Sequence, residues 1–224
     1  MESSGAVGLF TKHYRRRTKS SRVITQVKSK GRIERMKIQL MLAILLILGM
    51  STQVSRASEP VTVYLTTDVA VLPMVLVNAK SLTSQMFARA GVAIEWRNGL
   101  PLCPPTLDER KVVVHLEGRT PLNRLPGALG FARPYEGVNT IVFYDRVQRR
   151  APGNQSPMLL ALVMVHEITH LLQRENRHSA SGIMKATWAA SDYHQIAQNP
   201  FTDEDVDLIR LGLLTRKASL ASSQ

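Results

Sequence analysis

Two histidines and a glutamate lie close together in the stretch "VHEITHLLQRENRHSASGIM", residues 165–184. His166 and His170 are four residues apart, so on an α-helix both rings face the same side and can bind one metal ion. Glu167 projects beside them, where its carboxylate can bind a water without binding the metal. These residue types at this spacing predict a zinc site for hydrolysis, with Glu167 as the general base.

A third protein ligand is needed to complete such a site. The candidates are His178, His194, Asp192 and Glu204. His178 follows His170 by eight residues, and the intervening "LLQRENR" contains no glycine. We expect the helix to break at Asn176, because asparagine tolerates a left-handed backbone. A fourth ligand from Asp192, His194 or Glu204 would close the site and favour a zinc-binding domain without turnover. Glu204 as the sole third ligand is a further alternative.

The histidines lie in the strongest helical segment of the chain. Residues 158–173 contain no helix breaker, and the run 158–165 is apolar almost all round; Ser156 is the expected N-cap and Pro157 stands at the first helical position. Polar side chains at the end of a buried helix are costly unless something pairs with them, and a metal would do so. A second helix is predicted in "FTDEDVDLIRLGLL", residues 201–214, where Thr202 and Asp205 form a capping signature.

The residues before this helix predict a sheet. Residues 61–71 form a strand, a helix runs from Pro73 to Gly91, and residues 92–96 form a second strand, which together favour a parallel, right-handed βαβ unit. Residues 111–116 are nearly all apolar and suit a central strand. Residues 128–133 end at Pro134, which predicts an edge strand, and residues 140–145 form the last strand.

The pattern "HEITH…HS…GIM" resembles the metzincin clan of zinc peptidases, whose signature adds a third histidine and a turn containing methionine. The segment "GALGFARPYEGVNTIVFYDR", residues 127–146, is similar to the matrixin segment in which an edge strand lines the substrate cleft. In the clan the third histidine follows the second by six residues, with a glycine midway. The longer spacing and "MKATW", residues 184–188, resemble a branch of bacterial secreted proteins.

The resemblance implies an α+β fold: a mixed, twisted sheet of about five strands, a crossover helix, an active-site helix, a Met-turn and a C-terminal helix. It also implies a zinc endopeptidase with one Zn²⁺ per chain. The metal ligands would be His166, His170 and His178. Met184 would form the hydrophobic floor of the site. An extended peptide would bind the edge strand at Leu129, Gly130, Phe131 and Ala132.

The distribution of charge argues against nucleic acid as a partner. Residues 1–57 hold 12 Lys and Arg against 2 Asp and Glu, whereas residues 58–224 hold 17 against 15. Nearly all of the formal net charge of +12 therefore lies in the first quarter of the chain. The remainder has no basic field to attract phosphates.

The chain divides into four predicted segments. Residues 1–35 are a basic extension, 36–57 a signal peptide or uncleaved anchor, 58–216 the metzincin-like catalytic domain and 217–224 a disordered tail. An apolar run from Leu40 to Met50 precedes small residues at Ser55 and Ala57, which are typical of a signal-peptidase site. We therefore expect a protein that is secreted or periplasmic, or one held outside the cytoplasm by its anchor. We also expect a monomer, and the resemblance implies that it acts on peptides or proteins. Cys103 is the single cysteine and excludes an intrachain disulfide.

Overall fold

Five strands form one mixed sheet, in the order β2-β1-β3-β5-β4. The structure, a computed structural model, describes residues 59–106, 109–121 and 123–222, with side chains described as far as residue 216. The expected extension at 1–35 and the signal or anchor at 36–57 lie outside the described residues. The strands are β1 (Val61–Thr67), β2 (Ile94–Asn98), β3 (Lys111–Glu117), β4 (Gly130–Ala132) and β5 (Asn139–Phe143). The helices are α2 (Pro73–Arg89), α3 (Tyr144–Arg150), α4 (Ser156–Gln173), α5 (Tyr193–Gln198) and α6 (Asp203–Ser222).

The sheet is parallel except at one edge. β1 pairs in parallel with β2 and β3, and β3 pairs in parallel with β5. β3 is the middle strand and is buried along most of its length, as its apolar sequence predicts. β4 pairs antiparallel with β5, with Phe131 opposite Ile141, and its other edge pairs with no described strand. The chain therefore presents a short edge strand beside α4.

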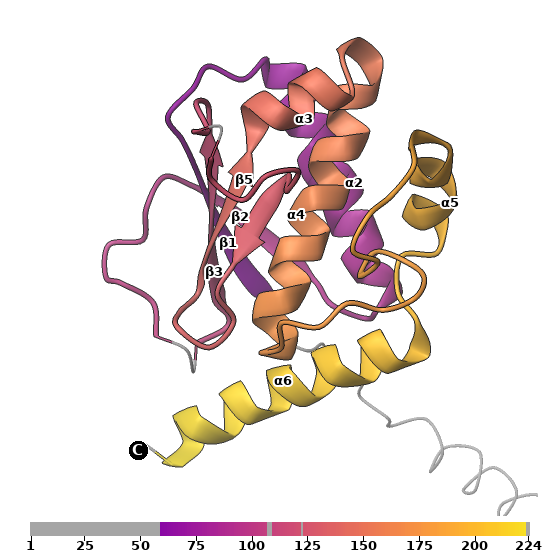
Figure 1. Cartoon of the computed structure of the whole chain (residues 1–224). Coiled ribbons are helices and arrows are strands. Elements are labelled where there is room, and N and C mark those ends of the chain that lie inside the picture. Colours follow the sequence, from indigo (N-terminus) through magenta and orange to yellow (C-terminus); the bar gives the residue numbers. More distant parts are fainter. Residues whose placement is uncertain (1–58, 107–108, 122, 223–224) are drawn as a thin grey trace, which may run out of the picture. The chain divides into compact units, whose positions relative to one another are not determined.

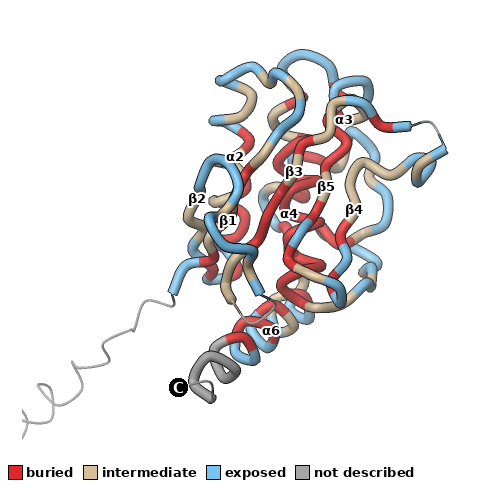
Figure 2. The backbone as a smooth tube through the Cα atoms, turned by 90° about the vertical axis from the view of Figure 1, so that its left-hand side faces the viewer, coloured by how far each residue is buried: buried red, intermediate tan, exposed pale blue. Residues whose placement is uncertain are grey.

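Two long helices cover one face of this sheet. α2 and α4 lie side by side against it, and α6 crosses the end of α4 (Figure 1). α4 lies between the sheet, α2 and α6, so nearly every one of its residues is buried (Figure 2). The apolar residues of α4 thus form the centre of the core, and its polar residues His166, Glu167 and His170 lie inside the protein with them.

The last helix begins as its sequence predicts. Thr202 Oγ1 accepts a hydrogen bond from the Asp205 amide at 3.2 Å, and Asp205 Oδ2 accepts one from the Thr202 amide at 3.0 Å. This reciprocal pair is a capping box. Further along α6, a Cβ on Gly212 would lie 1.8 Å from the Leu172 carbonyl oxygen. Glycine at this position therefore allows α6 to cross the end of α4 at close range.

Several local expectations are wrong. β1 ends at Thr67 and not at residue 71. Ser156 does not cap α4, because it lies within the helix and its buried hydroxyl has no hydrogen-bond partner among the described residues. The strand expected at 140–145 gives way to α3 at Tyr144, and neither α3 nor α5 was expected. α6 continues to Ser222 and includes most of the segment 217–224 that was expected to be a tail. No helix within the described residues is long and apolar enough to cross a bilayer.

Candidate metal centre

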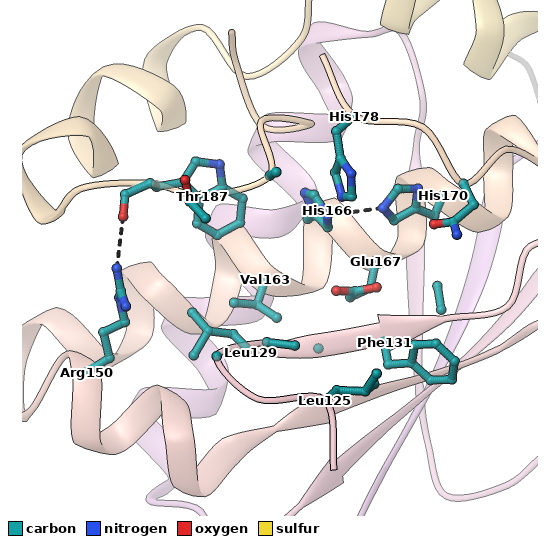
Figure 3. A pocket seen from close by; sticks show the side chains of 17 residues that line it. Leu125, Leu129, Phe131, Arg150, Val163, His166, Glu167, His170, His178 and Thr187 are labelled. Carbon is teal, nitrogen blue, oxygen red and sulfur yellow. Dashed lines mark hydrogen bonds between the residues drawn. The ribbon is translucent and has the colours of Figure 1, made fainter. Parts of the chain in front are cut away.

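Three histidine rings converge beside the C-terminal half of α4. His166 and His170 lie one above the other on the helix, with Nε2 atoms 3.1 Å apart. The ring of His178, from the loop after the helix, lies 5.2 Å from each of the other two rings by centroid (Figure 3). One nitrogen from each ring can be chosen so that all three lie within 4.8 Å of one another. Two of the histidines are buried and His178 is exposed.

The hydrogen bonds of the two helix histidines fix which nitrogen faces the centre. His166 Nδ1 lies 2.8 Å from the Ile183 carbonyl oxygen, and His170 Nδ1 lies 2.9 Å from that of Glu175. A carbonyl only accepts, so each neutral ring carries its proton on Nδ1 and has a lone pair on Nε2. These two lone pairs face each other and repel unless a cation lies between them. Two nitrogens bound to one zinc at about 2.0–2.1 Å lie roughly 3.3 Å apart in tetrahedral geometry, so the donor set fits zinc.

The surroundings keep both of these rings neutral. Burial, followed by the positive charge that His170 would carry, lowers the pKa of His166 to about 3. Burial also lowers the pKa of His170. Because a neutral imidazole is the form that binds a metal, both rings are ready to act as ligands at neutral pH.

The lengthened loop turns back through a residue that was not expected to do so. α4 ends at Gln173, and Arg174 takes a left-handed conformation with φ of 56°. The Glu175 amide then donates to the His170 carbonyl at 3.3 Å, while the Glu175 carbonyl accepts from the His170 ring. The expected break at Asn176 is therefore wrong by two residues. The tight turn reverses the chain early enough to bring His178 over the helix.

The turn containing Met184 lies against the histidine cluster. Met184 is fully buried, and its carbonyl accepts a hydrogen bond from the Ser179 amide at 2.8 Å. Gly182 has a φ of +72°, and a Cβ there would lie 2.6 Å from the Pro200 carbonyl oxygen, so glycine is required at this turn. The adjacent Ile183 carbonyl is the partner of His166 Nδ1. The turn thus orients a ring of the candidate metal site.

Glu167 lies between α4 and the edge strand. Its residue surface is 6% exposed, and burial raises the pKa of the carboxyl to about 8. The side chain faces β4, where a Cβ on Gly130 would lie 2.6 Å from its Oε1 atom (Figure 3). The carboxyl has no hydrogen-bond or ion-pair partner among the described residues. It is a general-base candidate held at the mouth of a cleft.

A cleft runs past the histidines and Glu167. One wall is formed by the edge strand and the residue before it, and the other by residues 186–188. The four predicted substrate-binding residues, Leu129, Gly130, Phe131 and Ala132, all line it. The Trp188 ring lies edge-on to His166, with ring centroids 5.4 Å apart. Arg150 lies at the far end, where its Nη2 donates to the Trp188 carbonyl at 3.1 Å (Figure 3).

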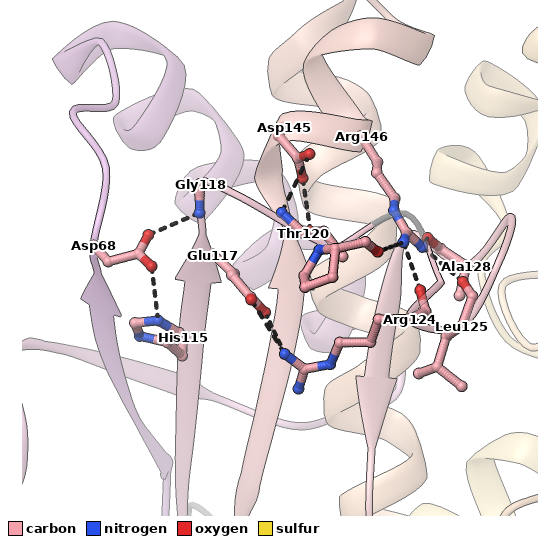
Figure 4. Close-up of polar contacts among 11 residues, drawn as sticks. Asp68, His115, Glu117, Gly118, Thr120, Arg124, Leu125, Ala128, Asp145 and Arg146 are labelled. Atoms are coloured by element: carbon pink, nitrogen blue, oxygen red, sulfur yellow. Dashed lines mark hydrogen bonds and ion pairs between the residues drawn. The ribbon is translucent and has the colours of Figure 1, made fainter.

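One arginine holds the loop that leads into the edge strand. The Arg146 guanidinium donates to the carbonyls of Leu125 at 2.6 Å and Ala128 at 2.8 Å, and to those of Pro121 and Arg124 (Figure 4). It also lies over the Phe143 ring, 4.7 Å from the centroid. Sequence reasoning gave no role to Arg146, because its partners are backbone carbonyls distant in the sequence.

The other sequence candidates lie outside the cluster. Asp192 accepts a hydrogen bond from the Ala189 amide at 3.1 Å, and Glu204 Oε2 lies 3.4 Å from Arg177 Nη2. His194 lines a second cleft, next to α2. Among the described residues, the cluster of potential metal ligands contains the three histidines alone. Cys103 is exposed and does not line the cleft.

Comparison with solved structures places the fold. The chain is similar to the crystal structure of archaemetzincin from Methanopyrus kandleri, with a TM-score of 0.50 and 15% sequence identity. The match covers 71% of this chain and 98% of that chain. The fold is metzincin-like. The five-stranded, mostly parallel sheet, the crossover helix α2, the helix α4 that carries the two histidines, and α6 are the elements that the sequence led us to expect. Neither a protein-family model nor a curated protein sequence matches the chain.

Proposed function

We propose that this protein is a zinc-dependent endopeptidase with one Zn²⁺ per chain, held by His166, His170 and His178. The two Nε2 atoms that lie 3.1 Å apart are the observation that carries the proposal, because with both rings neutral and protonated on Nδ1 a bound cation removes the repulsion between their lone pairs. Zinc bound there supplies Lewis acidity, which polarises a carbonyl and makes a water more acidic.

Glu167 acts as the proton carrier. A nearby cation favours the ionised carboxylate, which offsets the effect of burial on its pKa. The carboxylate then takes a proton from the attacking water and delivers it to the leaving amine. Because the Glu167 side chain lies between the histidines and β4, it can reach both the attacking water and the leaving amine.

The edge strand binds the substrate in this proposal. An extended peptide would add to the free edge of β4 through backbone hydrogen bonds, in the manner of β-augmentation. β4 is antiparallel to β5 and lines the cleft, which supports this role. In the same proposal, residues 127–146 correspond to the matrixin segment whose edge strand lines the substrate cleft.

We also propose where the protein acts, in which oligomeric state and on which class of substrate. The catalytic domain at 58–216 would act outside the cytoplasm, after export by residues 36–57 or while anchored by them. It would act as a monomer on peptides or unfolded proteins. The small net charge of residues 58–224 supports a partner other than nucleic acid.

Two histidine variants, compared with the wild type, test the metal site and the peptidase activity together. The wild type should bind one zinc per chain and cleave an unfolded protein, with cleavage stopped by a chelator and restored by zinc. His170→Ala should lose both properties. His194→Ala, which changes a histidine outside the cluster, should retain both. Equal zinc content and cleavage in the His170→Ala protein would refute the proposal.

A further inference from the structure

The loop that carries His178 is fixed by contacts on both sides of that residue. On one side, the Glu175 carbonyl accepts from the His170 ring at 2.9 Å. On the other, the Ser179 amide donates to the Met184 carbonyl at 2.8 Å. Between these points Arg177 is the nearest neighbour of His178 in the chain, and its side chain turns inward while His178 is exposed.

Arg177 reaches a fully buried carboxylate. Its Nη2 lies 2.9 Å from Asp205 Oδ1, and the Asp205 side chain is 0% exposed, whereas that of Arg177 is 24% exposed. Removing one partner of a buried ion pair leaves an uncompensated charge and is costly, so this contact keeps Arg177 against the start of α6. Two exposed carboxylates add further ion pairs: Glu204 Oε2 lies 3.4 Å from the same nitrogen, and Glu175 Oε2 lies 3.7 Å from Arg177 Nε.

Asp205 is itself held rigidly. Its other oxygen, Oδ2, accepts from the Thr202 amide at 3.0 Å and from the Thr202 hydroxyl at 2.7 Å. Its carbonyl accepts from Gln173 Nε2 at 3.2 Å, which ties the start of α6 to the last residue of α4. Arg177 is therefore attached to a fixed point of the core and not to a mobile surface group.

We propose that Arg177 and Asp205 form a latch that holds His178 in place as the third metal ligand. The inference rests on the proposed metal site and goes beyond it, because it makes zinc affinity depend on the start of α6. Arg177 is a positioning residue: it touches neither metal nor substrate, and it acts through the neighbouring His178. The latch fixes the position of His178 even though His178 follows His170 by eight residues. A shorter, more rigid loop would not need such a contact.

A double-mutant cycle separates this role from a general structural one. The first variant combines Arg177→Met with Asp205→Asn, which removes both charges and leaves neither one buried without its partner. Zinc affinity is measured by competition with a chromophoric chelator. We expect the combined variant to bind zinc about 10- to 100-fold more weakly than the wild type, as is common when groups that orient a ligand are lost. In a His178→Ala background the same pair of changes should alter the affinity less than about twofold, because the residue through which the latch acts is absent.

Two controls accompany the cycle. Arg210→Met removes an exposed ion pair on the same helix, in which Arg210 lies 3.5 Å from Asp207, and it should leave zinc affinity unchanged. Asp205→Asn alone retains oxygen and size at the capping position, so it should fold if the combined variant does not. The same loss of affinity, absent in the His178→Ala background, is expected for it.

The possible outcomes separate the latch from the metal site and from the peptidase activity. An unchanged zinc affinity in the latch variants overturns the latch, and an equal loss with and without His178 overturns it in favour of general loosening. A wild type that binds no zinc overturns the metal site and the latch together. A wild type that binds zinc but cleaves no substrate leaves the latch standing and refutes only the peptidase activity.

Discussion

At the scale of single residues, the site contains polar groups that the protein itself does not satisfy. The Nε2 atoms of His166 and His170 face each other, and the Glu167 carboxyl is buried without a partner among the described residues. Buried polar groups are costly when unpaired, and folded proteins rarely keep them without a reason. A metal ion, a water and a peptide would satisfy all three groups together. The arrangement is thus better suited to a ligand than to the protein alone.

Gly130 lets Glu167 sit against the edge strand, and its replacement should impair turnover selectively. In Gly130→Ala, the new Cβ would lie 2.6 Å from Glu167 Oε1, so the carboxyl must move. A displacement on the order of 1 Å at a reacting group can lower a rate by about 100-fold. We expect kcat for peptide hydrolysis to fall by about 10- to 100-fold, with zinc affinity unchanged.

Gly137→Ala is the matched control, because the nearest atom to a Cβ at Gly137 is 3.8 Å away. It should leave both kcat and zinc affinity unchanged. An unimpaired kcat in Gly130→Ala would contradict the assignment of Glu167 as the proton carrier at this position.

The raised pKa of Glu167 predicts a pH dependence of stability in the zinc-free protein. Burial raises the pKa from 4.5 to about 8, so the folded state favours the protonated carboxyl. This contribution is fully present below the unfolded pKa and is lost as pH rises through the folded pKa. Between pH of about 6.5 and 8, the free energy of unfolding should fall by on the order of 2 kcal/mol. Urea denaturation at several pH values measures it.

Glu167→Gln isolates this effect, because glutamine does not titrate. The depressed pKa of His166, about 3, removes stability only as pH falls below the ordinary value of 6.5, so it does not act in the same window. The Glu167→Gln protein should show no such fall between pH of about 6.5 and 8. Parallel curves for the two proteins would mean that Glu167 is not the group responsible.

At the scale of elements, the cleft wall depends on a loop with little regular structure of its own. The loop before β4 is held by the Arg146 guanidinium, which donates to carbonyls at both ends of it (Figure 4). Leu125 in this loop has a φ of 44°, a conformation unusual for a residue other than glycine. The arginine therefore maintains a strained loop that lines the cleft.

Loss of this arginine should affect substrate binding more than chemistry. In Arg146→Met, the loop carbonyls lose their donors and the cleft wall loosens, so we expect KM to rise by about 10-fold with a smaller change in kcat. Steady-state kinetics on a peptide substrate provides the measurement. Arg149→Met is the matched control, since the Arg149 side chain is exposed and pairs only with Asp145 on the same helix, without contacting the loop carbonyls. A similar rise in KM in both variants would refute the role of Arg146.

The sequence predicts those features that depend on local pattern. The four-residue spacing of His166 and His170 needs only a helix, and Pro134 at the end of residues 128–133 indicates an edge strand because it cannot donate a ladder hydrogen bond. The left-handed Arg174 could not be predicted, because local preference favours asparagine and the tertiary contacts of the loop decide instead. The Arg146 contacts could not be predicted either, because its partners are backbone carbonyls, which every residue has and which the sequence therefore does not distinguish.

At the scale of the whole molecule, distant segments of the chain converge on one small site. α4 provides two histidines and Glu167, the loop after it provides His178, the turn at Met184 orients one ring, and the start of α6 holds the loop. The sheet contributes the edge of β4 that pairs with no described strand. If the proposed latch holds His178, a change at the start of α6 should alter the affinity of the proposed metal site.

The most direct test of this account compares the wild type with Glu167→Ala for zinc binding and for cleavage of an unfolded protein. The wild type should bind one zinc per chain and cleave, with cleavage abolished by a chelator. The variant should bind zinc with the same affinity and lose about 100- to 10,000-fold in rate, the usual contribution of a general base. Cleavage by Glu167→Ala at the wild-type rate, or a zinc-loaded wild type that cleaves nothing, would contradict the account.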